Sequence, residues 1–130
     1  MSSVHGKSIL VVEDDAAMLR ALSKVLSAEG AVVSPASCTG EALEHLARAQ
    51  RRFDLLITDL VGLSPGEGSA LETVTAALPH VPVVIVTASG NPELRTQCLR
   101  QGAAAFLEKP VDTATLLVTI ERVLSSADLC

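Results

Sequence analysis

Acidic, hydroxyl and ammonium side chains follow four apolar runs of this sequence, each at the point where the run ends. Glu13 and Asp14 follow the aliphatic run ILVV, and Asp59 follows the segment FDLLIT. Thr87 closes the run PVVIVT, and Lys109 follows AAFLE. Carboxylates gathered at one place bind Mg²⁺, which prefers oxygen ligands, water and phosphate. An ammonium and a hydroxyl beside them suit phosphoryl transfer to a carboxylate, because negative charge develops on the phosphoryl oxygens.

Each of these residues also has an ordinary structural explanation. Glu13, Asp14 and Asp15 could start a helix, since the helix dipole favours acidic side chains in a first turn by about 0.3–1 kcal/mol each. Asp59 could cap a turn, the hydroxyl could bind a loop amide, and the ammonium could be a surface charge. Their joint occurrence at the ends of apolar runs favours one site. In it, Asp59 is the candidate nucleophile, and Glu13 and Asp14 are candidate metal ligands.

Five apolar runs predict β-strands, at residues 8–13, 31–36, 53–58, 82–87 and 104–108. Stretches with helical spacing lie between and after them. These run from about Met18 to Gly30, from Thr39 to about Arg51, from Gly68 or Ser69 to Leu78, from Asn91 to Gly102, and from a cap at Asp112 to about Ser125. Strands that alternate with helices predict an α/β fold with a doubly wound parallel sheet.

The second predicted strand contains Pro35, which has no backbone N–H to donate and therefore belongs at the edge of a sheet. An outermost second strand favours the strand order 2-1-3-4-5, the flavodoxin-like order. In such sheets ligands bind beyond the carboxyl ends of the strands, near the switch point between strands 1 and 3. The predicted order therefore brings the acidic, hydroxyl and ammonium residues to one edge of the sheet.

Length and composition agree with one globular domain. The chain has 130 residues, of which 48% are hydrophobic, and its apolar runs are far shorter than the ~20 residues of a membrane span. The opening residues MSSVHGKS do not resemble a signal peptide, so the predicted location is the cytoplasm. The cysteines, Cys38, Cys98 and Cys130, are odd in number and lack metal-type spacing, and they are predicted to be reduced thiols.

The charge and the shortage of aromatic residues argue against direct binding of nucleic acid. The net charge is −5, and Phe53 and Phe106 are the only aromatic side chains. Nucleic-acid binders usually present a basic stripe or rings on which bases stack. The negative net charge is better suited to binding a divalent cation than to binding nucleic acid.

Four motifs together resemble the response-regulator receiver domain of bacterial two-component signalling. They are ILVVEDD, FDLLITDL, VPVVIVTAS and AAAFLEKP, in this order and at this spacing. The resemblance extends from about Lys7 to Ser125, so residues 1–130 are expected to form a single receiver domain with five strands and five helices. It implies a signalling phospho-acceptor and not an enzyme acting on a separate substrate.

The resemblance also implies roles for individual residues. Asp59 is expected to accept a phosphoryl group from a histidine kinase or phosphotransfer protein. Mg²⁺ is expected to be held by Glu13 or Asp14, by Asp59 and by the backbone carbonyl of Val61.

Three further residues are assigned by the same resemblance. Lys109 is expected to bind the phosphoryl group, and the Lys109–Pro110 peptide is expected to be cis. Thr87 and Phe106 are expected to form a switch that changes the surface of the fourth helix, fifth strand and fifth helix. The downstream effector is not identified, and phosphorylation-dependent dimerisation is left open.

One segment departs from the family pattern. After the acceptor, the family usually has proline at the fourth position and glycine at the eighth, whereas DLVGLSPGEGSA has Pro65 at the sixth and Gly68 at the ninth. The loop from Gly62 to Gly68 is therefore predicted to be about a residue longer than usual. This affects where the Val61 carbonyl lies.

Two alternatives from other classes remain open at this point. A pseudo-receiver would keep the fold but bind partners without taking up phosphate, although all five polar positions are filled here. A dehalogenase-type phosphohydrolase would place an Asp-x-Asp nucleophile after strand 1, and EDDAAM lacks that spacing. Nucleotide binding is disfavoured because neither a glycine-rich phosphate loop nor G-x-G-x-x-G follows strand 1.

Overall fold

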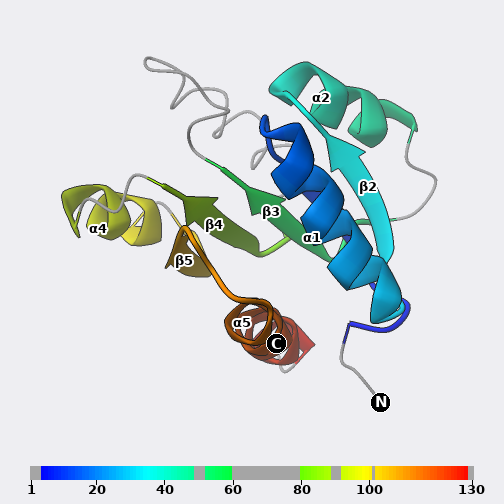
Figure 1. The fold of residues 1–130 in the computed structure, drawn as a ribbon. Coiled ribbons are helices and arrows are strands. Elements are labelled where there is room, and N and C mark those ends of the chain that lie inside the picture. Colours follow the sequence, from blue (N-terminus) through cyan, green and yellow to red (C-terminus); the bar gives the residue numbers. More distant parts are fainter. Residues whose placement is uncertain (1–3, 49–51, 60–79, 89–91, 101, 129–130) are drawn as a thin grey trace.

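The fold is a parallel five-stranded sheet with helices on both faces (Figure 1). The computed structural model describes residues 4–48, 52–59, 80–88, 92–100 and 102–128. The strands are β1 Ser8–Val12, β2 Val32–Ala36, β3 Leu55–Thr58, β4 Val83–Thr87 and β5 Ala105–Glu108. Neighbouring strands pair in parallel in the order β2-β1-β3-β4-β5, so the predicted α/β class and strand order are confirmed.

The described helices are α1 Ala16–Ala28, α2 Thr39–Arg48, α4 Pro92–Arg100 and α5 Thr113–Asp128. Gly30 follows α1 with φ 91°, a left-handed conformation that suits glycine, as expected of a C-terminal stop. Asp112 accepts from the Thr115 N–H at 2.8 Å and caps α5, which continues to Asp128, past the predicted end at Ser125.

Some predicted helix boundaries differ from the observed ones or cannot be compared. Thr39 is the first residue of α2 and not the residue before it, since the Cys38 carbonyl accepts the first-turn bond from Ala42. The predicted helix from Gly68 or Ser69 to Leu78 and the predicted start at Asn91 lie outside the described residues. Fewer helices are therefore described than the five that were predicted.

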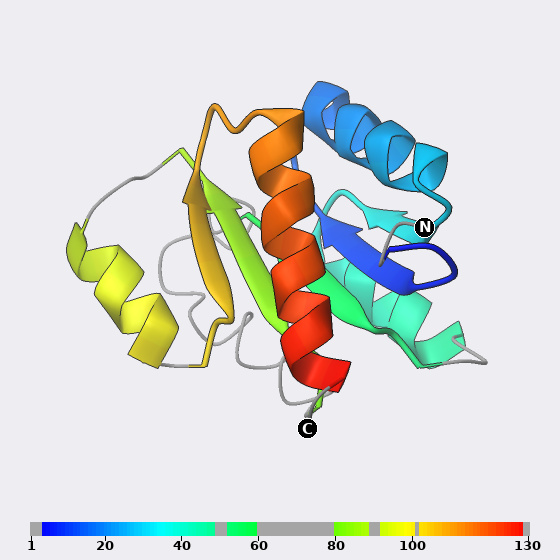
Figure 2. The same ribbon diagram turned by 90° about the horizontal axis from the view of Figure 1, so that it is seen from below.

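Alternate residues of the strands face opposite layers of the core. Ile9 and Val11 pack with Leu26 of α1 and Ile120 of α5 on one face. On the other face, a second cluster packs against α2 and α4 (Figure 2). Its buried members are Leu10, Val12, Ala36, Ala42, Phe53, Leu56, Val83, Ile85, Cys98 and Phe106. The strands are aliphatic at successive positions because both faces of the sheet are covered.

Strand β2 lies at one edge of the sheet, as the position of Pro35 predicted. Val32 donates to the Lys7 carbonyl and the Ala36 carbonyl accepts from Glu13, so the backbone at these even positions faces β1. The backbone of Pro35 consequently faces outward, where its missing N–H removes no ladder bond. Its carbonyl oxygen lies 2.7 Å from Nε2 of His45 in α2, and His45 must donate because a carbonyl only accepts.

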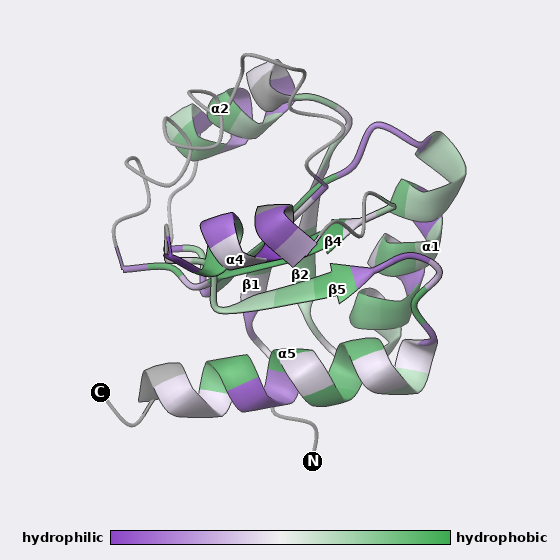
Figure 3. Cartoon of the chain, turned by 90° about the vertical axis from the view of Figure 1, so that its left-hand side faces the viewer, coloured by the Kyte–Doolittle hydropathy of each residue, from purple (hydrophilic) through white to green (hydrophobic). Residues whose placement is uncertain are grey.

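Helix α4 is the most polar of the described helices (Figure 3). Among its described side chains, Cys98 is the buried one, and it packs in the second core cluster. Cys38 and Cys98 are both free thiols, as predicted. Throughout the described part of the chain, every helix is too short or too polar to cross a membrane.

Candidate functional site

The predicted acidic, hydroxyl and ammonium side chains lie at the carboxyl edge of the sheet, as expected. Glu13 directly follows β1, Asp59 follows β3, Thr87 is the last residue of β4, and Lys109 follows β5. Backbone hydrogen bonds continue the sheet past the strand ends: the Asp59 N–H donates to Val12 at 3.1 Å, and the Lys109 N–H donates to Thr87 at 2.8 Å. The sheet itself therefore positions these residues, more firmly than a free loop would.

The Lys109 ammonium lies between two carboxylates. Its Nζ is 2.5 Å from Oδ2 of Asp59, 2.9 Å from Oε1 of Glu13 and 3.0 Å from Oε2 of Glu13. Glu13 and Asp59 are each 2% exposed, and the Lys109 side chain is 19% exposed. Buried charges of this kind require a partner, and the ammonium is the partner of both acids.

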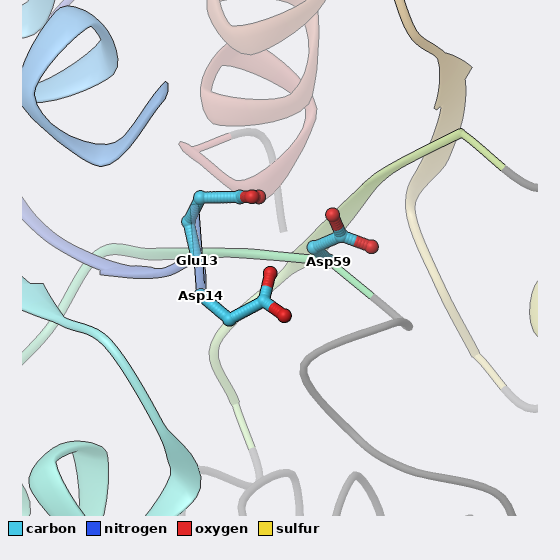
Figure 4. A group of neighbouring side chains, drawn as sticks. All are labelled: Glu13, Asp14 and Asp59. Carbon is cyan, nitrogen blue, oxygen red and sulfur yellow. The ribbon is translucent and has the colours of Figure 1, made fainter. Parts of the chain in front are cut away.

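Three carboxylates converge at this edge (Figure 4). Glu13, Asp14 and Asp59 each offer an oxygen, and these oxygens lie within 4.8 Å of one another. Glu13 and Asp59 are buried, whereas Asp14 is exposed to solvent. A set of oxygen donors that is open on one side fits a hard cation such as Mg²⁺, which keeps part of its water shell.

Burial and neighbouring charges both affect the titration of the site. Burial raises the pKa of the Glu13 carboxyl above its usual value; the hydrogen bond from Lys109 opposes this rise, and the charge of Asp59 adds to it. For Lys109, burial alone would lower the pKa, but hydrogen bonds and charges from Asp59 and Glu13 outweigh it, so the pKa is raised. The site therefore keeps its ammonium charged at neutral pH.

The helix-start explanation is correct for one of the three adjacent acids. Oδ1 of Asp15 accepts from the N–H groups of Ala17 at 2.9 Å and Met18 at 3.2 Å, which makes Asp15 the N-cap of α1. Glu13 and Asp14 instead direct their carboxylates toward Asp59 (Figure 4). The sequence motif EDD thus contains two kinds of acid that composition alone does not separate.

Thr87 and Phe106 lie on neighbouring strands. The Thr87 side chain is fully buried at the end of β4. Phe106 is 5% exposed and packs in the second core cluster, and it is paired in register with Ile85. The Lys109–Pro110 peptide is cis, as expected. Val61 and the segment from Gly62 to Gly68 lie outside the described residues.

The contact between Glu13 and Lys109 was not predicted from the sequence. Glu13 was assigned to the metal alone, and Lys109 to the phosphoryl group. The available signal was the strand order, because it places both residues at one edge, where opposite charges attract. The sequence does not show that the Lys109 ammonium reaches both Asp59 and Glu13.

Comparison with known proteins decides the family. The family model described as "Response regulator receiver domain" matches residues 9–121. The chain belongs to this family. It is the receiver domain of a response regulator, consistent with two-component signalling, and such domains are signalling domains and not classical enzymes. The phosphohydrolase alternative is set aside.

Several curated relatives are between 33% and 36% identical to this chain. The transcriptional regulatory protein ZraR of Escherichia coli O157:H7 is 36% identical over 118 residues, which are 90% of this chain and 26% of ZraR. Protein PilH of Pseudomonas aeruginosa is 35% identical over 119 residues, which are 90% of this chain and 97% of PilH. The chain spans about a quarter of ZraR and nearly all of PilH.

Solved structures share the same architecture. A CheY-like receiver domain protein from Methanospirillum hungatei JF-1 is 29% identical, with a TM-score of 0.83 over 95% of this chain and 97% of that chain. NtrX from Brucella abortus, in complex with ADP, is 28% identical, with a TM-score of 0.83 over 95% of this chain and 27% of NtrX.

Proposed function

We propose that Asp59 accepts a phosphoryl group from a histidine kinase or phosphotransfer protein. The observation that carries this proposal is the contact at 2.5 Å between its buried carboxylate and the Lys109 ammonium, beside two further carboxylates. A carboxylate so placed has a cation ready to neutralise charge on an incoming phosphoryl group. Asp14 and Asp15, by contrast, are exposed to solvent.

The transfer is an in-line displacement at phosphorus. An oxygen of Asp59 forms a bond to phosphorus, and the bond between phosphorus and the donor nitrogen breaks. The electron pair of that bond stays on the imidazole, which then takes up a proton. The product is an aspartyl phosphate, and Lys109 binds its phosphoryl oxygens.

Glu13, Asp14 and Asp59 are the residues that would hold Mg²⁺, together with the Val61 carbonyl. All their side-chain donors are oxygens, which fits the preference of this ion. When bound, Mg²⁺ neutralises negative charge on the phosphoryl oxygens during transfer. Lys109 supplies the other positive charge from the protein itself.

Labelling tests the acceptor. Incubation with acetyl phosphate and Mg²⁺ should add one phosphate per chain, detected by intact mass spectrometry and removed by hydroxylamine. Asp59→Asn should abolish this addition, and a chelator should abolish it in wild type. Asp54→Asn is the matched control, because it makes the same chemical change at the other end of β3 and should label normally. Persistent labelling of Asp59→Asn, or a folded wild type that never labels, would refute the proposal; the second result would indicate a pseudo-receiver.

We also propose that phosphorylation is read through Thr87 and Phe106. The Thr87 hydroxyl would donate to a phosphoryl oxygen, and Phe106 would repack beside it. Helix α4 is the element best able to respond, since Cys98 is its one buried residue among those described. The surface of α4, β5 and α5 would then present the signal to an effector, and dimerisation on that surface stays a prediction.

Spectra with beryllofluoride, a mimic of the phosphoryl group, test this switch. In wild type, NMR shifts should extend from Asp59 through Thr87 to Phe106 and to about residues 91–122. In Thr87→Ala, the shifts beyond the site should largely disappear. Shifts confined to the Asp59 edge in wild type would contradict the switch and leave the acceptor assignment intact.

A further inference from the structure

We propose that one face of helix α4 binds the same face of a second copy of this chain, with the two helices antiparallel. This face carries Glu93 near the start of the helix and Arg100 at its end. In the antiparallel pair, the Glu93 carboxylate of each chain meets the Arg100 guanidinium of the other. The contact requires no phosphoryl group, so the inference does not rest on Asp59 being the acceptor.

Helix α4 lies at one end of the molecule and contributes little to the core (Figure 1 and Figure 2). It has nine residues, fewer than the ~12–15 that an isolated helix needs to be stable in water. Cys98 packs in the second core cluster, and every other described side chain of the helix is exposed. A helix that is exposed on nearly all sides receives little stability from its own domain, so a partner surface would stabilise it.

Glu93 and Arg100 share the side of α4 that is turned away from the core. At 3.6 residues per turn, seven residues are about 20° short of two full turns, so these two side chains lie on one face, about 10.5 Å apart along the axis. Cys98 is about 140° from Glu93 round the helix. The described residues that line a groove of about 590 Å³ on this face are Pro92, Glu93, Thr96, Gln97 and Arg100.

The order of charges along this face makes the face complementary to itself. In a symmetric dimer every contact is repeated in reverse, so one pair of Glu93 with Arg100 is accompanied by a second. Thr96 and Gln97 lie midway between the two charges, where hydroxyl and amide groups can exchange hydrogen bonds across the contact. A parallel arrangement would instead bring like charges together. The charges therefore select the antiparallel dimer.

The helix dipole offers a simpler explanation of the two charges. It favours Glu93 in the first turn and Arg100 in the last turn, whatever side of the helix they occupy. The dipole does not require that both charges share one face, or that this face is turned from the core. Nor are the two residues a pair within one helix, because side chains on one helix pair over three or four residues and not over seven. The dimer explains the shared face as well as the order of the charges.

The contact is small, so the expected dimer is weak. A helix of nine residues is about 13.5 Å long, and the area that it can bury falls below the ~1,200 Å² of standard interfaces. The net charge of −5 on each chain adds repulsion, which salt at about 0.15 M screens beyond ~8 Å. The dissociation constant is therefore expected to be on the order of 0.1–1 mM.

Sedimentation equilibrium of the unphosphorylated protein in about 0.15 M salt measures this association. Glu93→Arg and Arg100→Glu should each weaken self-association at least about tenfold, because each brings like charges together across the contact. A mixture of these two variants should associate, since one then carries two cations on the face and the other two anions. The double variant Glu93→Arg with Arg100→Glu should associate about as well as wild type.

Arg95→Glu is the matched control. It makes the same change of charge as Arg100→Glu, but about 200° from Glu93 round the helix, so it should leave the association nearly unchanged. Circular dichroism of each variant checks that the fold is retained.

Three results would overturn the inference. The first is a wild type that is monomeric at about 1 mM. The second is a dimer that both single variants leave intact, which would place the contact on another surface. The third is a mixture of the single variants that stays monomeric, which would leave this face to a partner other than a second copy. Failure of the acceptor proposal would change none of these measurements, because the protein is tested without a phosphoryl group.

Discussion

Two aspartates flank β3 and have different environments at its two ends. Asp54 precedes the strand; its Oδ2 accepts from the Ser8 N–H at 2.8 Å, and its own N–H donates to the Ser8 carbonyl at 2.7 Å. Asp59 follows the strand and contacts the Lys109 ammonium at 2.5 Å. Asp54 is half-buried, whereas Asp59 is buried.

The polarity of the backbone explains this difference. At the amino edge of a parallel sheet the first N–H groups lack ladder partners, so a carboxylate there can accept from the backbone. At the carboxyl edge carbonyl oxygens are exposed, and they repel a carboxylate. An acid at that edge therefore needs a cation, either an ammonium or a metal ion. The same residue type is structural at one end of β3 and suited to chemistry at the other.

The largest change in the free energy of unfolding is expected when the cation at the carboxyl edge is removed. Lys109→Met leaves Glu13 and Asp59 buried without their partner, and breaking a buried ion pair costs about 3–5 kcal/mol. Urea denaturation at pH 8 should show this loss, and Mg²⁺ should restore part of it. Lys24→Met, at an exposed position of α1, should change stability by less than about 0.5 kcal/mol. A similarly small change in the stability of Lys109→Met would mean that water solvates the Glu13 and Asp59 carboxylates well enough to replace the ammonium.

At the amino edge, substitution of Asp54 should lower the free energy of unfolding by less and should leave phosphorylation unchanged. Asp54→Ala removes the acceptor of the Ser8 N–H and should cost about 1.5 kcal/mol. Asp54→Asn keeps an acceptor oxygen and should cost less. Labelling by acetyl phosphate should be normal in both variants when it is measured below their unfolding transitions. A labelling defect in either would show that the two ends of β3 are coupled.

Substitution of the adjacent acids Asp14 and Asp15 by alanine should change the stability of the metal-free protein in opposite directions. Asp15→Ala removes the N-cap of α1 and should destabilise the metal-free protein by about 1 kcal/mol. Asp14→Ala relieves repulsion among the three carboxylates, so it should raise the melting temperature by a few degrees while weakening Mg²⁺ binding. Calorimetry with and without Mg²⁺ measures both changes. A lower melting temperature in Asp14→Ala, with unchanged Mg²⁺ affinity, would favour the helix-start explanation for Asp14 as well.

The smallest expected effect is a pH dependence at the carboxyl edge. The folded pKa of Glu13 is raised above its reference value of 4.5, so the folded state binds this proton more tightly than the unfolded state. Glu13 therefore opposes folding above its folded pKa, and this cost is relieved as the pH falls toward 4.5. The free energy of unfolding of wild type, relative to Glu13→Gln, should rise over that range. If this difference in the free energy of unfolding falls as the pH falls, the hydrogen bond from Lys109 has a larger effect on the pKa of Glu13 than burial has.

The pKa of Lys109 makes the complementary prediction at high pH. Its pKa is raised above 10.5, so its contribution to stability is complete below pH 10.5 and is lost as the pH rises further. Lys109→Met should lack this alkaline loss.

The sequence predicted those features that depend on local pattern. The aliphatic runs located the strands, and Pro35 placed β2 at the edge of the sheet. The strand order inferred from this then predicted which edge of the sheet carries the site. Strand β3 begins at Leu55 and not at residue 53, and the side chain of Asp54, the residue before it, accepts from the Ser8 N–H. That contact joins residues 46 positions apart, and the contact of Glu13 with Lys109 joins residues 96 apart. Side-chain reach across the sheet decides both contacts, and sequence spacing carries little information about it.

The outer edge of β2 has a consequence for association between chains. An open strand edge is a template onto which another extended chain can add, and this is a common route to aggregation. Here Pro35 offers no N–H to such a chain, and its carbonyl oxygen is already bound by His45. The edge is therefore blocked at Pro35, near its carboxyl end, by one imino acid and one side chain. His45→Ala should leave the folded domain intact but make concentrated solutions more prone to form β-rich assemblies, which thioflavin binding would detect.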